Sequence, residues 1–204
     1  RNWKLWKKSY WGKGTTPALR AGASVYRALT RHMTLIIKVP ATSANLGPGF
    51  DALGLALDLW NESTFELADE FKVFVEGEGK EKLAQSTNNM IIRVAKILAD
   101  RVGKELPPFI VRCVNHIPTG SGLGSSAAAT LTGLLAANAL TESSLSQEEL
   151  LGFAAELEGH PDNVAPAMMG GLVVSTFGDD KVIARKLPIT PMYITIVLPD
   201  FHFP

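Results

Sequence analysis

The stretch IPTGSGLGSSAAA, residues 117–129, alternates glycines with hydroxyl-bearing residues directly before a run of alanines. The first backbone N–H groups of a helix have no partner inside the helix, and the helix dipole adds about half a positive charge there. Glycines let such a backbone approach a ligand closely, because no Cβ stands in the way. The stretch therefore predicts a cradle for the phosphates of a nucleotide at the start of a helix. A tight turn before a buried helix is the alternative that these residues leave open.

Two common phosphate-binding loops do not fit this stretch. A Walker A loop ends in lysine followed by serine or threonine, and no lysine lies between Lys104 and Lys181. A dinucleotide-binding fingerprint needs a glycine three residues after Gly122, where the chain has Ser125. A phosphate loop here is therefore of another type.

The composition is that of an ordinary globular protein, with 46% apolar and 20% charged residues among 204. No apolar stretch approaches the roughly 20 residues needed to span a bilayer. The one cysteine, Cys113, lies in the strand-like segment FIVRCVNHI, so we expect a buried, unreactive thiol in a reducing compartment. These features predict a cytoplasmic protein that does not associate with membranes.

The net charge of zero hides an uneven distribution. Residues 1–32 hold eight Lys or Arg and no Asp or Glu, whereas residues 33–204 hold 12 basic and 20 acidic residues. A basic leader is typical of a transit peptide or a nucleic-acid-binding arm. Because Met33 is followed at once by the strand-like TLIIKVP, we instead expect residues 1–32 to be an extraneous leader. We also expect the chain to be an N-terminal fragment, with one domain over residues 33–165 and the start of a second over 166–204.

Hydrophobic periodicity predicts strands alternating with helices, which indicates an α/β or α+β fold. Ser146 and Glu149 form a capping box, which marks the start of one of the helices. The expected strands are residues 35–39 (ended by Pro40), 63–67, 71–77, 109–117, 171–177 and 192–199. The expected helices are residues 89–103, 125–139 and 146–158, the second of them apolar on almost every side.

The longer string PTGSGLGSSAAA resembles the phosphate-binding motif of the GHMP kinases, which has the form Pro-x-Gly-x-Gly-Leu-Gly-Ser-Ser-Ala. The resemblance implies an ATP-binding domain like that of ribosomal protein S5, followed by the start of a ferredoxin-like domain. It also implies that the loop residues bind ATP. They are Pro118, Gly120, Ser121, Gly122, Leu123, Gly124, Ser125, Ser126 and Ala127. Asn89, with Asn88 as the alternative, matches a family residue near the adenine, although a helix N-cap explains it equally well.

The second motif is VPATSANLGPGFDALGLALDLWNE, residues 39–62. Taken alone, its polar, glycine-rich centre predicts an Asx-type turn. The string resembles the first signature of the homoserine kinases within the GHMP family, whereas galactokinases and mevalonate kinases carry different first motifs. That resemblance implies that Asn45 and Asp51 contact the amino and hydroxyl groups of the substrate.

The third motif is AAELEGHPDNVAPAMMGG, residues 154–171, which also resembles the homoserine kinases. By that resemblance Glu156 ligates Mg²⁺ together with Ser126 (or Ser125), and His160 contacts the amino-acid substrate. Some relatives use an aspartate of this motif as a general base, which points to Asp162. The roles of Asp162 and Asn163 stay open, because a base is defined by its reach to the proton.

Together the three motifs imply transfer of the γ-phosphoryl group of ATP to the hydroxyl of L-homoserine, a step of threonine biosynthesis. Such a transfer needs positioning and charge stabilisation. Asp51, Asp162 and Asn163 are the expected catalytic residues, ATP and Mg²⁺ the cofactors, and a homodimer the expected assembly. Another small-molecule GHMP kinase and a non-catalytic nucleotide-binding relative are the alternatives. Nucleic-acid binding by the basic leader is disfavoured, because the rest of the chain is acidic.

Overall fold

The computed structural model describes residues 3–4, 22–29, 33–81, 83, 88–179, 181–190 and 192–199. Within these residues, seven strands form one mixed sheet. Its main path runs β2(Ser24–Leu29), β3(Met33–Leu46), β4(Gly49–Leu67), β6(Phe109–Asn115) and β5(Lys72–Gly77). The two strands β7(Leu172–Phe177) and β8(Val182–Leu187) extend the sheet from the first part of β4. A separate two-stranded pair joins β1(Trp3–Lys4) to β9(Leu198–Pro199).

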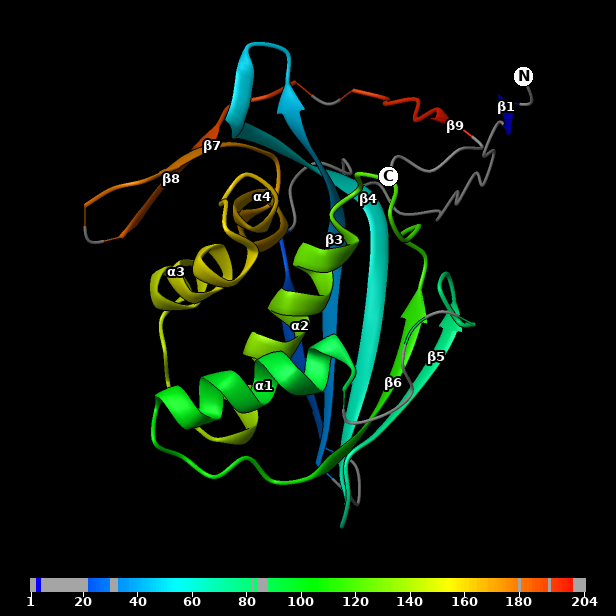
Figure 1. Cartoon of the computed structure of the whole chain (residues 1–204), viewed down its shortest axis with the longest axis vertical. Coiled ribbons are helices and arrows are strands. Elements are labelled where there is room, and N and C mark those ends of the chain that lie inside the picture. The colour runs from blue at the N-terminus through cyan, green and yellow to red at the C-terminus, as the bar shows by residue number, and fades with distance from the viewer. Residues whose placement is uncertain are drawn as a thin grey trace.

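Four helices lie together on one face of this sheet (Figure 1). They are α1(Met90–Arg101), α2(Ser125–Leu140), α3(Gln147–Glu158) and α4(Val164–Met169). The apolar side of α1 packs on α2, and α2 is buried on nearly all sides, as its alanine-rich sequence predicts. None of the described helices is both long and apolar enough to cross a lipid bilayer.

The core lies between the sheet and the helices. Its largest side chains include Phe65 of β4 and Phe109 of β6, whose rings meet edge to face with centroids 5.2 Å apart. The sheet alternates buried and exposed residues along β5 and β6, so only one face is covered by helices. In contrast to the sheet, α2 is buried on nearly all of its sides.

Most expected elements are present, and three expectations are wrong. The strand predicted to end at Pro40 continues to Leu46, because a register shift between Pro40 and Thr42 accommodates the proline. The strand expected at residues 63–67 begins earlier, at Gly49, because the apolar segment before residue 63 belongs to the same long strand, β4. In the predicted strand 192–199, only Leu198–Pro199 pair with another strand. The sequence reasoning also missed α4 and β8.

Two observations bear on the expected domain division. Residues Ser24–Leu29 of the basic leader pair antiparallel with β3, whereas most of residues 1–32 lie outside the described part of the chain. Strand β7 pairs with β4, so the sheet continues past the boundary expected near residue 166. The division into domains stays a prediction.

Candidate active site

The glycine-rich stretch forms a loop between β6 and α2. Gly120, Gly122 and Gly124 all have positive φ angles, of 67°, 74° and 70°. Alternation of such residues with right-handed ones turns successive N–H groups toward one side, which makes a concave anion site. A Cβ added at Gly120 or Gly122 would meet nothing within 4 Å, so the space in front of the loop is open.

Three contacts hold the loop in place. The Leu123 side chain is buried in the core, and the Leu123 carbonyl accepts a hydrogen bond from the backbone N–H of Thr42 on β3 at 3.1 Å. The Ser121 hydroxyl donates to the Pro118 carbonyl at 2.7 Å, which closes the turn. The loop is therefore fixed before any ligand arrives.

The N-terminus of α2 is suited to an anion. Its N-cap, Gly124, offers no side-chain hydrogen bond, and the first turn holds no acidic residue. The first N–H groups of the helix therefore point from Ser125 and Ser126 toward the loop without a capping partner. Together with the glycine backbone they form a concave helix start at the place where the sequence predicts a phosphate cradle, and phosphate binding there stays a prediction.

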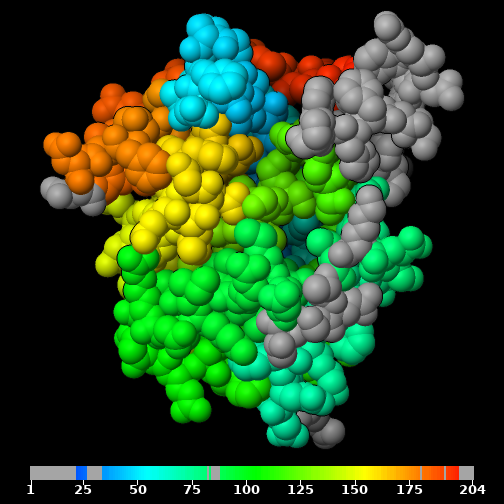
Figure 2. All heavy atoms as spheres, viewed as in Figure 1, coloured from blue at the N-terminus to red at the C-terminus, as the bar shows by residue number. Residues whose placement is uncertain are grey.

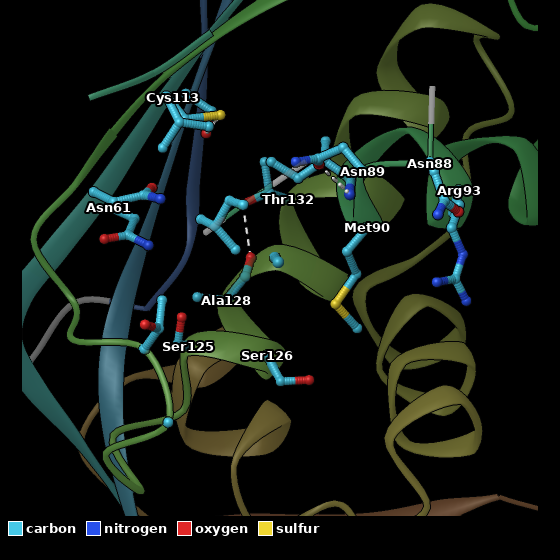
Figure 3. Close-up of a pocket in the computed structure, with 18 residues that line it drawn as sticks. Asn61, Asn88, Asn89, Met90, Arg93, Cys113, Ser125, Ser126, Ala128 and Thr132 are labelled. Atoms are coloured by element: carbon cyan, nitrogen blue, oxygen red, sulfur yellow. Dashed lines mark hydrogen bonds between the residues drawn. The ribbon is translucent and has the colours of Figure 1, made fainter. Parts of the chain in front are cut away.

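A cavity of about 390 Å³ opens from this loop, between the start of α1 and the strands β4 and β6. In Figure 3, Asn61 and Cys113 lie on the strand side, while Asn88, Asn89 and Met90 lie on the helix side. Ser125 and Ser126 lie at its lower end (Figure 3). Figure 2 shows this face of the molecule, which is hollowed beside the green atoms of α1. Its size suits a nucleoside.

Asn89 has two functions in this geometry. Its side chain caps α1 by accepting a hydrogen bond from the Ile91 N–H at 3.0 Å, and it also lines the cavity. Cys113 lies on the cavity wall and is buried, as the sequence predicts. Burial raises the pKa of its thiol, while a hydrogen bond from Ser63 acts in the opposite direction.

A carboxylate stands over the start of α2, and it belongs to Glu158. The Ser126 hydroxyl lies 2.8 Å from both carboxylate oxygens of Glu158, and Thr130, one turn later, donates to the same group at 2.6 Å. A hydroxyl and a carboxylate beside a phosphate site are oxygen ligands of the kind that Mg²⁺ prefers.

The structure does not bring Glu156, the expected metal ligand, to this place. Glu156 forms a two-point ion pair with Arg101 of α1, at 2.7 and 3.2 Å, and both side chains are exposed. Residues two apart on a helix point about 200° away from each other, so only one of Glu156 and Glu158 can face α2. Glu158, rather than the expected Glu156, therefore lies beside the glycine-rich loop, and the identity of a metal ligand stays a prediction.

The tip of the β3–β4 hairpin presents Asn45 and Asp51. The Asn45 side-chain oxygen accepts a hydrogen bond from the Asp51 N–H at 2.9 Å, and both residues have positive φ angles, of 57° and 54°. Asn and Asp tolerate this conformation better than most residues. The contact leaves the Asp51 carboxylate exposed at the tip.

The turn after α3 carries His160, Asp162 and Asn163 in one hydrogen-bonded cluster. Asp162 is 1% exposed, and its Oδ1 lies 2.7 Å from His160 Nδ1 and 3.2 Å from Asn163 Nδ2. The Asn163 oxygen accepts from Thr42 Oγ1 at 2.8 Å. The turn also packs closely on β4, because a Cβ on Gly54 would lie 1.8 Å from the Asp162 carbonyl oxygen.

Comparison with known proteins gives this geometry a family. Residues 89–171 match the model of the GHMP kinases N terminal domain. The chain is 46% identical over 167 residues to a homoserine kinase of Carboxydothermus hydrogenoformans, covering 81% of this chain and 55% of that protein. The chain belongs to the GHMP kinase family.

Two further proteins similar to this GHMP kinase chain are also homoserine kinases. A homoserine kinase of Caldanaerobacter subterraneus is 49% identical over 152 residues, covering 74% of this chain and 49% of that protein. A crystal structure of homoserine kinase from Cytophaga hutchinsonii superposes with a TM-score of 0.65 at 31% identity, covering 81% of this chain and 54% of that one. The chain spans about half the length of these relatives.

In this GHMP kinase chain the hydrogen bonds of Thr42 join the glycine-rich loop to the turn after α3, whereas the hydrogen bond at the hairpin tip joins Asn45 to Asp51. Sequence reasoning missed Thr42, Thr130 and Glu158 as members of the site. A signal for Thr130 was present, since Ser126 and Thr130 are four residues apart and must share a face of α2. No comparable signal marked Thr42, whose partner lies 121 residues away in the sequence.

Proposed function

We propose that this protein transfers the γ-phosphoryl group of ATP to the side-chain hydroxyl of L-homoserine, giving O-phospho-L-homoserine for threonine biosynthesis. The observation that carries the proposal is the uncapped N-terminus of α2 behind the glycine loop, with the Ser126–Glu158 pair beside it. Similarity to homoserine kinases over about four fifths of the chain supports the choice of acceptor.

The loop amides from Gly120 to Ser126 would bind the β- and γ-phosphates. The contacts of Ser121 and Leu123 already hold this backbone, so little reorganisation is needed when negative charge moves during transfer. The nucleoside would occupy the adjoining cavity, where Asn89 is fixed by its cap on α1. Pro118, Ser121 and Leu123 support the loop, and the N–H of Ala127 belongs to the first turn of α2.

The residues present fit Mg²⁺. Ser126 and Glu158 would hold the ion against the phosphates, and the ion would neutralise charge on the phosphoryl oxygens. Among the described residues no group of three or more His, Cys, Asp or Glu side chains could hold a metal by itself. This agrees with an ion that binds through one carboxylate, one hydroxyl and the nucleotide.

The acceptor would lie between the hairpin tip and the turn after α3. The exposed Asp51 carboxylate, on a hairpin tip held by Asn45, suits an ammonium group, and His160 offers a second polar contact to an amino acid. Asn163 contacts the phosphate loop, because a Cβ on Gly124 would lie 3.3 Å from its oxygen. In this proposal the Asn163 amide would lie between the two substrates.

Asp162 has a different role in this proposal from that of a general base. It is almost completely buried, and its Oδ1 already accepts two hydrogen bonds. A base must reach the proton that it removes. We therefore assign Asp162 to holding His160 and Asn163. The hydroxyl proton can pass directly to the transferred phosphate, since a loose transition state makes little demand on a base.

The proposal also includes a cytoplasmic location and a homodimer. A buried, unpaired Cys113 supports a reducing compartment. A second copy would cover apolar side chains that the described part of the chain exposes, such as Phe50 and Phe177.

The test is ADP release with Mg·ATP and each of L-homoserine, mevalonate and no acceptor, using protein made from the complete reading frame that encodes this chain. Turnover that depends on homoserine is expected. Turnover with mevalonate would keep the fold and the phosphate loop but discard the acceptor. Tight ATP binding without turnover on either acceptor would favour the non-catalytic relative.

A further inference from the structure

Thr42 occupies an unusual place at the junction of three parts of the site. It is completely buried on β3, three residues before Asn45. Its backbone N–H donates to the phosphate loop at Leu123, and its hydroxyl donates to Asn163 after α3. It also stands so close to the loop that a Cβ on Gly124 would lie 2.1 Å from its hydroxyl oxygen. No other described residue joins these segments by both a backbone and a side-chain hydrogen bond.

The hydroxyl of Thr42 and the carboxylate of Asp162 together hold the Asn163 amide in one orientation. With its oxygen toward Thr42, Asn163 accepts one hydrogen bond and donates another to Asp162. If the amide were reversed, its oxygen would face the Asp162 carboxylate oxygen, and two acceptors would meet. The observed orientation is the one that satisfies both neighbours.

The same chain of hydrogen bonds reaches His160. A carboxylate oxygen accepts hydrogen bonds, so the His160 Nδ1 facing Asp162 carries the proton. In the neutral ring the other nitrogen, Nε2, is then an acceptor on a half-exposed imidazole. Thr42 therefore donates to Asn163, whereas Asn163 and His160 both donate to the Asp162 carboxylate, where the two ends of the chain of hydrogen bonds meet.

A second observation shows that Asn163 makes these hydrogen bonds in place of a cap on its own helix. Asn163 is the N-cap of α4, a position at which asparagine normally bonds to its own helix. Its side chain makes no cap bond and is used instead for Thr42 and Asp162. The helix loses a cap, and the site gains a fixed amide.

We propose that Thr42 is a positioning residue of the phosphoryl-transfer site, which holds the Asn163 amide and thereby keeps the Asp162 carboxylate in the place from which it fixes the tautomer of His160. The kinetic part of this inference rests on the proposed kinase function, whereas the tautomer does not. The ligand bound in this way is a small phosphoryl acceptor. Its ammonium or hydroxyl group would donate a hydrogen bond to His160 Nε2.

The kinetic experiment compares Thr42→Val with Thr42→Ser in the full-length protein. Valine keeps the shape and the backbone N–H but loses the hydroxyl, which leaves the Asn163 oxygen without its donor. We expect kcat/KM for the acceptor to fall about tenfold or more, with nearly unchanged affinity for Mg·ATP, and the serine variant to restore most of the loss. Ser175→Ala is the matched control, because Ser175 is a buried hydroxyl without a hydrogen-bond partner.

Equal losses in the valine and serine variants, or a loss of Mg·ATP affinity alone, would overturn the positioning role. If wild-type protein turns over no acceptor, the proposed function fails. The positioning role of Thr42 is then tested by the tautomer of His160 alone. Nitrogen-15 NMR spectra at about pH 8, where free imidazole is neutral, would show which ring nitrogen of His160 carries the proton. The His160→Gln variant would assign the signal. The expected result is a protonated Nδ1 in wild-type protein and mixed tautomers in Thr42→Val. A protonated Nε2 in wild-type protein would refute the proposal even if the valine variant does not fold.

Discussion

The hydroxyl of Ser126, at the start of α2, lies 2.8 Å from both carboxylate oxygens of Glu158, at the end of α3. This contact joins the phosphate loop to the segment that leads into the HPDN turn. It also distinguishes Glu158 from Glu156, which faces Arg101 instead. Glu158 is therefore the carboxylate that lies close enough to the loop to share a metal ion with it.

Replacing Glu158 with Gln should weaken divalent-ion binding, whereas replacing Glu156 with Gln should not. The reason is that only Glu158 lies against Ser126. With Mn²⁺ as the probe and electron paramagnetic resonance as the measurement, the Kd in the presence of ATP should rise in Glu158→Gln by more than the roughly 10- to 100-fold typical of second-shell changes. Glu156→Gln serves as the control, and a similar loss in both variants would disprove the assignment.

Thr130 should hold the metal-binding carboxylate in place. It is fully buried and donates to Glu158 Oε1 at 2.6 Å, from one helical turn beyond Ser126. Thr130→Val should raise the Mn²⁺ Kd roughly tenfold, and Thr130→Ser should recover most of the affinity. Thr141→Val removes a hydroxyl that bonds only to Ser143 and to the Ala137 carbonyl of its own helix, so it provides the comparison. Unchanged affinity in Thr130→Val would show that Glu158 needs no such support.

The glycine-rich loop and the helices could be predicted from the sequence because both depend on local patterns. The alternating glycines, the capping box of Ser146 and the apolar face of α1 are each set by residues within a few positions. The same reasoning failed at Pro40, where the shift in register depends on the partner strand β4 rather than on the proline itself. Strand length is decided by pairing between distant segments.

The choice between Glu156 and Glu158 shows a second limit. The sequence ELE offers two glutamates, and a choice between them needs the rotation of α3 about its axis relative to α2. That rotation is fixed by the burial of Leu150, Leu151, Ala154 and Ala155. A helical projection of α3 from these apolar positions would have narrowed the choice, but the partner of each glutamate depends on tertiary packing.

Gly124 should tolerate alanine less well than Gly122 does. Both have positive φ, which costs roughly 1–2 kcal/mol for a residue with a Cβ. At Gly124 the added Cβ also meets Thr42 Oγ1, while at Gly122 it meets nothing within 4 Å. Gly103→Ala is the control, because Gly103 has positive φ and open space but lies far from the loop in the sequence. Urea unfolding should show the largest loss for Gly124→Ala.

The same glycine variants separate stability from ligand binding. Gly122→Ala and Gly103→Ala should lose similar stability, since the conformational cost is the same. Only Gly122→Ala should also lose Mg·ATP affinity, because its methyl group would stand where the phosphates approach the loop. Equal nucleotide affinity in these two variants, measured by calorimetry, would argue against phosphate binding at the loop.

Cys113 should react slowly with thiol reagents and more slowly still when nucleotide is bound. Burial raises the pKa of its thiol, so little thiolate is present at neutral pH, and the side chain lies on the wall of the cavity. Peptide mapping by mass spectrometry would follow alkylation of Cys113 with and without Mg·ATP. Alkylation in the presence of Mg·GTP would show whether the protection of Cys113 depends on the nucleotide base. Alkylation that Mg·ATP does not slow would show that the nucleoside binds elsewhere.

The Arg101–Glu156 pair should make a small, pH-dependent contribution to stability. Hydrogen bonds from the Arg101 guanidinium lower the pKa of Glu156 below its usual 4.5, and they exceed the opposing effect of desolvation. Because the folded-state pKa is the lower one, the contribution is complete above the unfolded-state value and is lost as pH falls through the folded-state value. The stability difference between wild-type protein and Glu156→Gln should therefore be present at neutral pH and disappear in acid. Since both side chains are exposed, added salt should reduce it too, and a difference that grew as pH fell would contradict the pairing.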